Sequence, residues 1–290
     1  MEFANYVAGI QDIIKRGGPE ASEYEYLKNV PDGMSEMPLE DQNRVYEVLS
    51  PLLTVDSMIG FTFQKPHGYA GDFELIDRIY SQRQSKNNDL CKWDIFYHKL
   101  EAATAVRNRK KYFKDLVELT ESKHKTPRVL NLGSGPCSDL YEYLQSKSKH
   151  STKFECLDMD ETAIEFGSAV CDNYIDNIKF IHKNAFRFKP DYQYELIWSA
   201  GLFDYFNDKL FVRLLNRMYV LVKEGGELVI GNFSDENPSR AVMEVFGQWY
   251  LHHRGEEKLT ELAILAGIPK EKIRVSQEEE GVNLFLHVSK

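Results

Sequence analysis

Two glycines close an apolar run in VLNLGSGP at 129–136, a pattern typical of a buried strand that ends in a nucleotide-binding turn. Glycine lets the backbone come close to a ligand and adopt positive φ angles there. A dinucleotide fingerprint needs a third glycine, and Ser138 stands at that position. Pro136 also lacks the backbone N–H from which a diphosphate would accept a hydrogen bond. The turn therefore favours a nucleoside ligand without phosphate groups.

Polar residues at the ends of the next two apolar runs are candidates to bind such a ligand. Asp158 ends the run FECLD about 23 residues after Gly135, where a carboxylate can accept hydrogen bonds from both ribose hydroxyls. Asp160 is the second candidate, and as a helix N-cap it has an equally good structural explanation. Asn184 and Ala185 follow the third run and are expected at the adenine, with a plain turn as the alternative for the asparagine.

The segment SAGLFDYF at 199–206 follows a fourth apolar run, at the sheet edge where open α/β folds bind ligands. Ser199 is predicted to contact the cofactor, Asp204 to contact substrate and Tyr205 to face the reacting group. For Phe203 and Phe206 we expect core packing.

Two segments elsewhere in the chain gather further reactive types. KPHGYAGD at 65–72 supplies His67, Tyr69 and Asp72, although a glycine turn with Asp72 capping a helix over 73–80 explains the same letters. WYLHHR at 249–254 is expected to wall a substrate pocket with Trp249, His253 and Arg254. Adjacent histidines on a helix point about 100° apart and chelate poorly, so no metal is predicted.

Arg107 lies beside Val106 on a predicted helix, where it can flank the buried stripe and clamp a carboxylate with two hydrogen bonds. The alternative for the cluster RNRKK at 107–111 is a solvated face.

The pattern of elements divides the chain into two predicted domains, 1–125 and 126–290. The first has helical periodicity and few strand signals, with breaks at 31–33 and 65–68 and one long helix from about 89 to 120. In the second, strands at 128–132, 153–158, 178–182, 194–199 and 226–232 alternate with helices that begin near 138, 161, 207 and 237. We predict a doubly wound, Rossmann-like α/β sheet.

The last segment indicates what kind of α/β sheet this is. Residues 272–276 and 282–288 are joined too closely for a helical crossover, so the final strand must be antiparallel. A parallel sheet with an antiparallel terminal hairpin is the topology of class I S-adenosylmethionine (SAM) methyltransferases, and SAM carries no phosphate. We therefore predict SAM as the cofactor. Its predicted ligands are Asn131, Gly133, Ser134, Gly135, Asp158, Asn184, Ala185 and Ser199.

Charge and cysteine content set limits on partners and compartment. With 45 acidic and 36 basic residues the chain carries a net charge of −9, which disfavours nucleic acid and anionic membranes and favours a small-molecule partner. The four cysteines form no CxxC pair, and we find neither an export signal nor an apolar stretch long enough to span a membrane. We expect a cytoplasmic protein, with homodimer formation left open.

Five motifs together resemble one bacterial group of class I methyltransferases, which includes enzymes that make 3-hydroxy fatty acid methyl esters such as 3-hydroxypalmitate methyl ester. The motifs are KPHGYAGDFELID at 65–77, AVRNRK at 105–110, VLNLGSGP at 129–136, SAGLFDYF at 199–206 and GNFSDENPSRAVMEVFGQWYLHHR at 231–254. GYAGD and AVRNR are the more distinctive ones. The resemblance implies site roles for Tyr69, Asp72 and Arg107.

The resemblance implies methyl transfer to a carboxylate, which is already ionised at neutral pH and needs no general base. Arg107 or His67 would then orient the acid, and Tyr69 and Tyr205 would line the path of the methyl group. A hydroxyl or amine acceptor would instead need His67, His252 or His253 as base. Related azetidine-2-carboxylate synthases cyclise SAM itself, and a SAM-binding module without catalysis is a further alternative, with an NAD-dependent oxidoreductase more remote.

Overall fold

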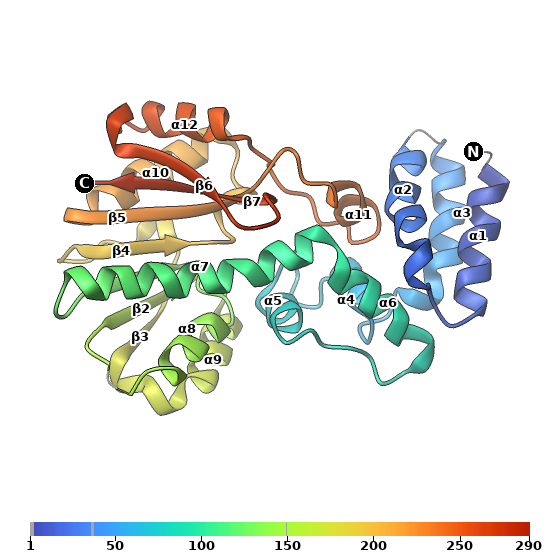
Figure 1. Ribbon diagram of the computed structural model, residues 1–290, viewed down its shortest axis with the longest axis horizontal. Coiled ribbons are helices and arrows are strands. Elements are labelled where there is room, and N and C mark those ends of the chain that lie inside the picture. The colour runs from blue at the N-terminus through green and yellow to red at the C-terminus, as the bar shows by residue number, and fades with distance from the viewer. Residues whose placement is uncertain (1–2, 36–37, 149) are drawn as a thin grey trace. The chain divides into compact units, whose positions relative to one another are not determined.

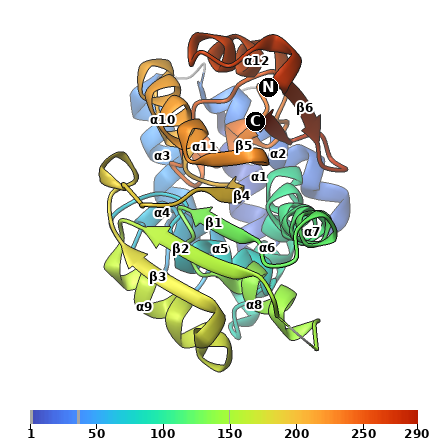
Figure 2. The same cartoon turned by 90° about the vertical axis from the view of Figure 1, so that its left-hand side faces the viewer.

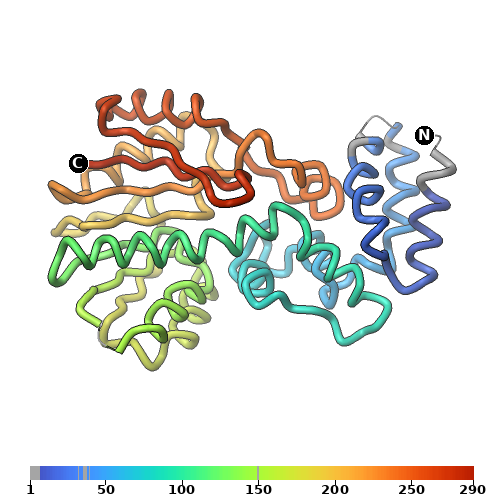
Figure 3. The backbone as a smooth tube through the Cα atoms, in the orientation of Figure 1, coloured from blue at the N-terminus to red at the C-terminus, as the bar shows by residue number. Residues whose placement is uncertain are grey.

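The computed structural model describes residues 3–35, 38–148 and 150–290 of the chain. It separates them into two compact units, each made of two chain segments, which Figure 3 allows the reader to trace. The helical unit comprises residues 1–104 and 238–250, and the sheet unit comprises 105–237 and 251–290. These limits differ from the predicted boundary at 125/126 in two ways. Most of helix α7 (Glu101–Lys123) belongs to the sheet unit, and residues 238–250 belong to the helical unit.

The sheet unit contains seven strands in the order β3-β2-β1-β4-β5-β7-β6. The strands are β1 (Arg128–Leu132), β2 (Lys153–Asp158), β3 (Ile178–His182), β4 (Tyr194–Ser199), β5 (Val222–Phe233), β6 (Ile273–Gln277) and β7 (Asn283–Ser289). Strands β1 to β5 pair in parallel, whereas β7 pairs antiparallel with both β5 and β6. The predicted α/β class and the antiparallel final strand are therefore confirmed.

Helices cover both faces of this sheet, as Figure 2 shows. Helices α10 (Asp208–Val220) and α12 (Glu256–Leu265) bury leucine and phenylalanine side chains on one face. Helix α8 (Ser138–Gln145) and the sheet-unit part of α7 bury theirs on the other. Helix α9 (Glu161–Val170) contacts β2 and β3. Each face buries an apolar helix stripe, which is the arrangement that stabilises a doubly wound sheet.

The helical unit consists of short helices. They are α1 (Phe3–Lys15), α2 (Tyr24–Ser35), α3 (Leu39–Leu49), α4 (Met58–Gln64), α5 (Phe73–Tyr80), α6 (Asn88–Lys99), the first turn of α7 and α11 (Arg240–Val245). Helices α1, α2 and α3 lie together in Figure 1. The 3₁₀ turns of the chain are η1 (Ala21–Glu23), η2 (Ser50–Leu52), η3 (Asp172–Asn177), η4 (Ala185–Arg187), η5 (Phe203–Tyr205) and η6 (Lys270–Lys272).

Two predictions for the helical half are wrong. The expected break at 31–33 is absent, because Pro31 lies inside α2, whose neighbours Leu27 and Val30 are fully buried. The expected long helix is two helices, since Leu100 adopts an extended conformation with ψ of 140°. A new helix can begin there because Ser239, a residue far along the chain, accepts a hydrogen bond from the N–H of Ala102 (3.2 Å).

The described residues contain no helix that is both long and apolar enough to cross a membrane.

Candidate cofactor and substrate site

The turn after β1 is held by the neighbouring strand. The N–H groups of Gly133 and Ser134 donate to the carbonyl oxygen of Leu157 at 2.8 and 3.2 Å. Gly133 and Gly135 have φ angles of 68° and 53°, which L side chains rarely adopt. A Cβ at Gly133 would lie 3.1 Å from the Cβ of Leu202, whereas one at Gly135 would meet no atom within 4 Å. The side chain of Leu202 therefore packs against the first glycine of the turn, whereas the space beside the second glycine is open.

Two polar side chains at this turn are buried. Asn131 is 3% exposed and Ser134 is 6% exposed. Among the described residues, neither the Nδ2 of Asn131 nor the Oγ of Ser134 has a hydrogen-bond partner. Since buried polar groups in native proteins are nearly always satisfied, these two atoms indicate a polar ligand. An amide N–H and a hydroxyl beside an open glycine suit the amino-acid part of SAM, so the residues present fit this cofactor.

Asp158 connects the turn to the end of β2. Its Oδ2 accepts from the N–H of Gly135 and its Oδ1 from the N–H of Asp160, both at 3.0 Å. Burial raises the pKa of Asp158, and the backbone N–H groups act against that rise. Each carboxylate oxygen keeps a further lone pair, so ribose hydroxyls can still donate to it. Ribose binding by Asp158 stays a prediction.

The structural alternatives for Asp160 and Asn184 are both present. Asp160 caps α9 by accepting from the N–H of Thr162 (2.9 Å). Asn184 caps the 3₁₀ turn η4 by accepting from the N–H of Phe186 (2.9 Å), and Ala185 behind it is buried. The amide N–H₂ of Asn184 lies on an exposed residue, which leaves its predicted contact with adenine open to test.

Beyond β4, two of the predicted residues are used inside the protein. Ser199 is fully buried and donates its hydroxyl proton to the carbonyl of Leu132 (2.8 Å), so it joins β4 to β1. Asp204 is 2% exposed and accepts from the N–H of Phe233 (2.7 Å). Burial raises the pKa of Asp204 to about 6. Tyr205 is 37% exposed, and Phe203 is a fully buried core residue as expected.

Arg254 is buried and forms hydrogen bonds within the sheet unit. Its guanidinium is 3% exposed and donates to Asn232 Oδ1 (3.0 Å), Phe206 O (2.5 Å) and Asp208 Oδ1 (3.1 Å). These bonds fasten the loop after β4 to the end of β5. The Nε2 of His253 lies 3.2 Å from the Nδ2 of Asn237. Arg254 therefore has a structural role within the sheet unit, and its contact with substrate stays a prediction.

Helix α7 brings two arginines to the sheet unit. Arg109 is 6% exposed and donates through Nη1 to the carbonyl of Ala200 (2.6 Å), directly after β4. Arg107 is half-buried, and burial lowers its pKa while the charge of Glu280 acts against that lowering. Sequence reasoning placed Arg107 at the buried stripe and missed Arg109. The spacing of residues 105, 109 and 113 could have predicted the burial of Arg109, because Ala105 and Phe113, one helical turn to either side, are fully buried.

The loop at 65–72 lies in the helical unit. Asp72 is buried and caps α5 by accepting from the N–H of Leu75 (2.8 Å), so its predicted alternative role is present. Burial raises the pKa of this carboxyl. His67 Nε2 lies 3.0 Å from Glu74 Oε2, and Tyr69 is 40% exposed.

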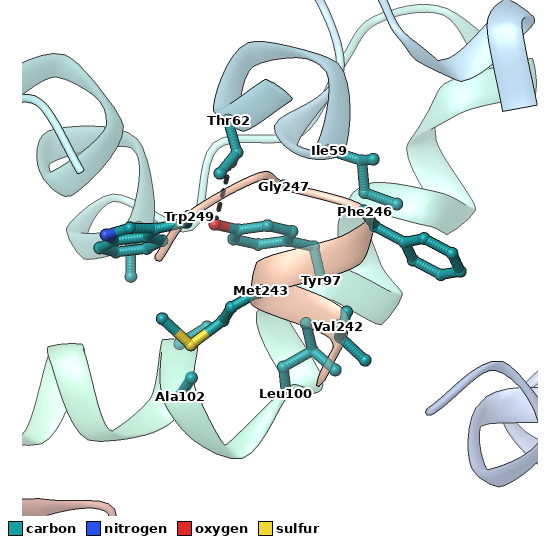
Figure 4. A pocket seen from close by; sticks show the side chains of 12 residues that line it. Ile59, Thr62, Tyr97, Leu100, Ala102, Val242, Met243, Phe246, Gly247 and Trp249 are labelled. Atoms are coloured by element: carbon teal, nitrogen blue, oxygen red, sulfur yellow. Dashed lines mark hydrogen bonds between the residues drawn. The ribbon is translucent and has the colours of Figure 1, made fainter. Parts of the chain in front are cut away.

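The helical unit also encloses a pocket, drawn in Figure 4. It is lined by Ile59, Thr62, Ile79, Tyr97, Leu100, Ala102, Ala103, Val242, Met243, Phe246, Gly247 and Trp249. Trp249, predicted to bind substrate, is therefore a pocket residue and is 5% exposed. Only Trp249 among the predicted site residues lies here. Within the described ranges, no three His, Cys, Asp or Glu side chains are grouped to hold a metal ion.

Comparison with known proteins agrees with this geometry. Residues 129–226 match a family model described as a methyltransferase domain. Malonyl-[acyl-carrier protein] O-methyltransferase 1 from Ilyobacter polytropus is 24% identical over 127 residues, which cover 43% of this chain and 46% of that protein. The matched region thus spans about half the length of this curated relative.

Two solved structures share the fold. A "possible exported protein" from Bordetella parapertussis superposes with a TM-score of 0.65 at 16% identity, covering 100% of this chain and 97% of that one. Magnesium protoporphyrin IX methyltransferase (ChlM) from Synechocystis PCC 6803, with bound S-adenosylhomocysteine, superposes with a TM-score of 0.51 at 11% identity, covering 65% and 87%. The strand order and the glycine turn of the sheet unit agree with the methyltransferase-domain model that residues 129–226 match. The cofactor of such methyltransferase domains is SAM.

Proposed function

We propose that the protein transfers a methyl group from SAM to the carboxylate of a small organic acid, with a 3-hydroxy fatty acid as the first candidate. The observation that carries the proposal is the position of Arg107 and Arg109 on α7. Arg109 bonds to Ala200 at the carboxyl edge of the sheet, which is the edge that also holds the glycine turn. Arginine binds a carboxylate with two parallel, charge-assisted hydrogen bonds.

Arg107 is the arginine assigned to the acid. Arg109 is buried, whereas Arg107 is half-buried, so that part of its side chain is accessible and burial lowers its pKa. A guanidinium keeps its charge at every physiological pH, so burial increases its preference for an anionic partner. An acidic acceptor meets this preference.

The state of the carboxylates in the sheet unit also favours an acceptor that is already ionised. Asp158 and Asp204 both accept hydrogen bonds from backbone N–H groups, and these bonds hold the two carboxylates in the protein framework. A carboxylate nucleophile has a pKa of about 4 and needs no proton removed. Catalysis then depends on alignment of the reacting atoms in a site from which water is excluded.

The name of the curated relative supports an oxygen acceptor, because that enzyme is an O-methyltransferase of malonyl-[acyl-carrier protein]. When bound, SAM supplies a methyl group on a positively charged sulfur. Asn131, Ser134 and Asp158 would hold the cofactor, and Arg107 would orient the acceptor carboxylate towards it. Tyr69 and Tyr205 remain the proposed aromatic residues along the path of the methyl group.

Incubation of the purified protein with SAM, alone and with a panel of 3-hydroxy and unsubstituted fatty acids, tests the proposal by mass spectrometry. We expect S-adenosylhomocysteine and a methyl ester only when an acid is present. Methylthioadenosine formed without any acid would overturn the proposal in favour of SAM cyclisation. Binding of SAM with neither product under all conditions would indicate a binding module.

A further inference from the structure

Four polar side chains of the sheet unit meet on the antiparallel part of the sheet, several strands away from the glycine turn. They are Glu227 on β5, Ser276 on β6, His287 on β7 and Tyr112 on α7. Strand β7 lies between β5 and β6, and residues two positions apart along a strand share one face of the sheet. The register therefore places His287 between a carboxylate on one side and a hydroxyl on the other.

Both ring nitrogens of His287 have partners. The Oε1 of Glu227 lies 2.9 Å from Nδ1, whereas the Oγ of Ser276 and the Oη of Tyr112 lie 3.0 and 2.6 Å from Nε2. The two hydroxyl oxygens are 2.5 Å apart. A histidine within hydrogen-bond distance of a serine hydroxyl, with a carboxylate on its other nitrogen, is the arrangement that activates serine as a nucleophile.

Glu227 determines which nitrogen of His287 carries the proton. Burial acts to raise the pKa of Glu227, but the hydrogen bond to His287 and the charge of Arg274 outweigh burial, so the pKa is lowered. An ionised carboxylate only accepts hydrogen bonds, which places the proton on Nδ1 and leaves the lone pair of Nε2 for the hydroxyls. Nε2 is then available as a base.

Arg274 approaches the same side of the histidine. Its Nη2 lies 2.8 Å from Nδ1 of His287 and 3.7 Å from Oε1 of Glu227, on a side chain that is 60% exposed. If Nδ1 accepted a proton from Arg274, Nε2 would carry the ring proton and Ser276 would have no base. The reactivity of Ser276 therefore distinguishes the two protonation patterns.

We propose that Ser276 is an activated nucleophile that accepts the acyl group of activated esters and thioesters. Its oxygen forms a bond to the acyl carbon, its proton passes to Nε2 of His287, and the bond from that carbon to the leaving oxygen or sulfur breaks. The leaving group takes the proton from Nε2. Water then releases the acid by the same steps and restores the hydroxyl. This reaction requires neither SAM nor the glycine turn.

The position of Ser276 limits the class of substrate. Ser276 is half-buried on β6, which among the described residues has a neighbouring strand on one side only. The N–H of Glu278 donates to Asn283 on β7 (3.2 Å), so the N–H of Gln277 points away from β7. One N–H beside the nucleophile stabilises an oxyanion less than a complete oxyanion hole does. The substrate therefore needs a good leaving group, such as a phenol or a thiol.

A fluorophosphonate probe tests the reactivity of Ser276 in the full-length protein. The probe forms a bond to an activated serine oxygen with loss of fluoride, and mass spectrometry locates the adduct. We expect the adduct on Ser276 and its absence in Ser276→Ala. Ser289→Ala is the matched control, because Ser289 is half-buried on β7 and donates to the carbonyl of Lys272 (3.4 Å). In the wild-type protein, labelling of Ser276 no faster than that of Ser289 would overturn the inference.

Glu227→Gln tests whether the carboxylate contributes to the reactivity. Glutamine can still accept the hydrogen bond from Nδ1 but carries no charge to stabilise a protonated His287. Since general base catalysis contributes about 10²–10⁴-fold, we expect labelling of Ser276 to slow by about 100-fold. Release of nitrophenolate from p-nitrophenyl acetate, measured without SAM, should slow in parallel. An unchanged labelling rate in a variant with wild-type circular dichroism would contradict the proposed role of His287.

Discussion

At the scale of single residues, Asp158 gives the sharpest test of cofactor binding. Asp158→Asn keeps the size of the side chain but replaces one carboxylate oxygen by an N–H₂ group, which then faces one of the two hydrogen-bond donors, the N–H of Gly135 or that of Asp160. Hydrogen bonds to charged groups contribute about 1.5–3 kcal/mol, so we expect SAM affinity to fall by about tenfold or more in isothermal calorimetry.

The matched control is Asp160→Asn, because asparagine caps helices as well as aspartate does. This variant should keep wild-type affinity. A larger loss in Asp160→Asn than in Asp158→Asn would identify Asp160 as the ribose ligand instead.

Asp204 predicts a pH-dependent stability. Burial raises its pKa from 3.8 to about 6, so the folded state favours the protonated acid more than the unfolded state does. The stabilising contribution of the protonated form is complete below pH 3.8 and is lost as the pH rises through 6. The loss is on the order of 3 kcal/mol, at about 1.36 kcal/mol for each pH unit of difference between the two pKa values.

Asp204→Asn removes this titration and can still accept a hydrogen bond from the N–H of Phe233. In urea unfolding, the stability of the variant relative to wild type should therefore increase between pH 4 and pH 8. A difference that stays constant over this range would show that Asp204 does not titrate as described.

At the scale of elements, the turn after β1 combines backbone strain with an opening. Gly135→Ala places a Cβ at a φ of 53°, and Gly225→Ala does so at 79°, with no atom within 4 Å of either Cβ. Both substitutions should cost about 1 kcal/mol of unfolding free energy, which is the usual penalty for the left-handed conformation. Only Gly135→Ala should also weaken SAM binding. Equal SAM affinity in both variants would mean that the cofactor does not approach Gly135.

Helix α7 allows the role of Arg107 in acid binding to be separated from a general loss of charge. Arg107→Ala should lower kcat/KM for an acid acceptor by about tenfold or more and leave the Kd of SAM unchanged. Lys111→Ala removes a cation one turn further along, from a side chain that is 75% exposed, and should change neither quantity. Parallel losses in the two variants would point to long-range electrostatics.

Local patterns explain why most of the sheet unit could be predicted. Strands β1 to β4 have their predicted bounds, because short buried apolar runs between turns leave little freedom. The caps at Asp72 and Asp160 were foreseen as alternatives, since such residues satisfy backbone donors wherever a helix begins, and for Asn184 a turn was foreseen. Non-local contacts could not be predicted. The break at Leu100 depends on a cap from Ser239, which local spacing cannot reveal.

The candidate site was predicted less completely than the fold. The glycine turn and Asp158 lie where the pattern places them, because both follow strand ends directly. Arg254 and Ser199 carry suitable functional groups, yet both are used by backbone carbonyls of neighbouring segments. Residue type alone does not say whether a polar side chain faces a ligand or the protein.

At the scale of the whole molecule, segment 238–250 belongs to the helical unit although it lies between β5 and α12 in sequence. Within that unit Val242, Met243, Phe246 and Trp249 are buried. A variant that lacks residues 1–104 should therefore expose these side chains and aggregate. Replacing 238–250 in the same variant by a short Gly/Ser linker should restore solubility, because the side chains of Asn237 and His253 on either side are in contact, with Nδ2 and Nε2 3.2 Å apart.

Calorimetric binding of SAM to the linker variant then measures whether the sheet unit suffices for the cofactor. We expect binding, since Asn131, Ser134, Gly135 and Asp158 all lie in that unit. If the variant folds but does not bind SAM, residues of the helical unit are required.

The interleaved chain also has a consequence for synthesis on the ribosome. Residues 1–104 emerge well before 238–250, the segment that completes their packing. At about 5–20 residues per second, the roughly 130 intervening residues take on the order of 7–27 s to translate. During that interval residues 1–104 expose the apolar surface that 238–250 later buries. The protein should therefore depend most on chaperones at this stage of biosynthesis.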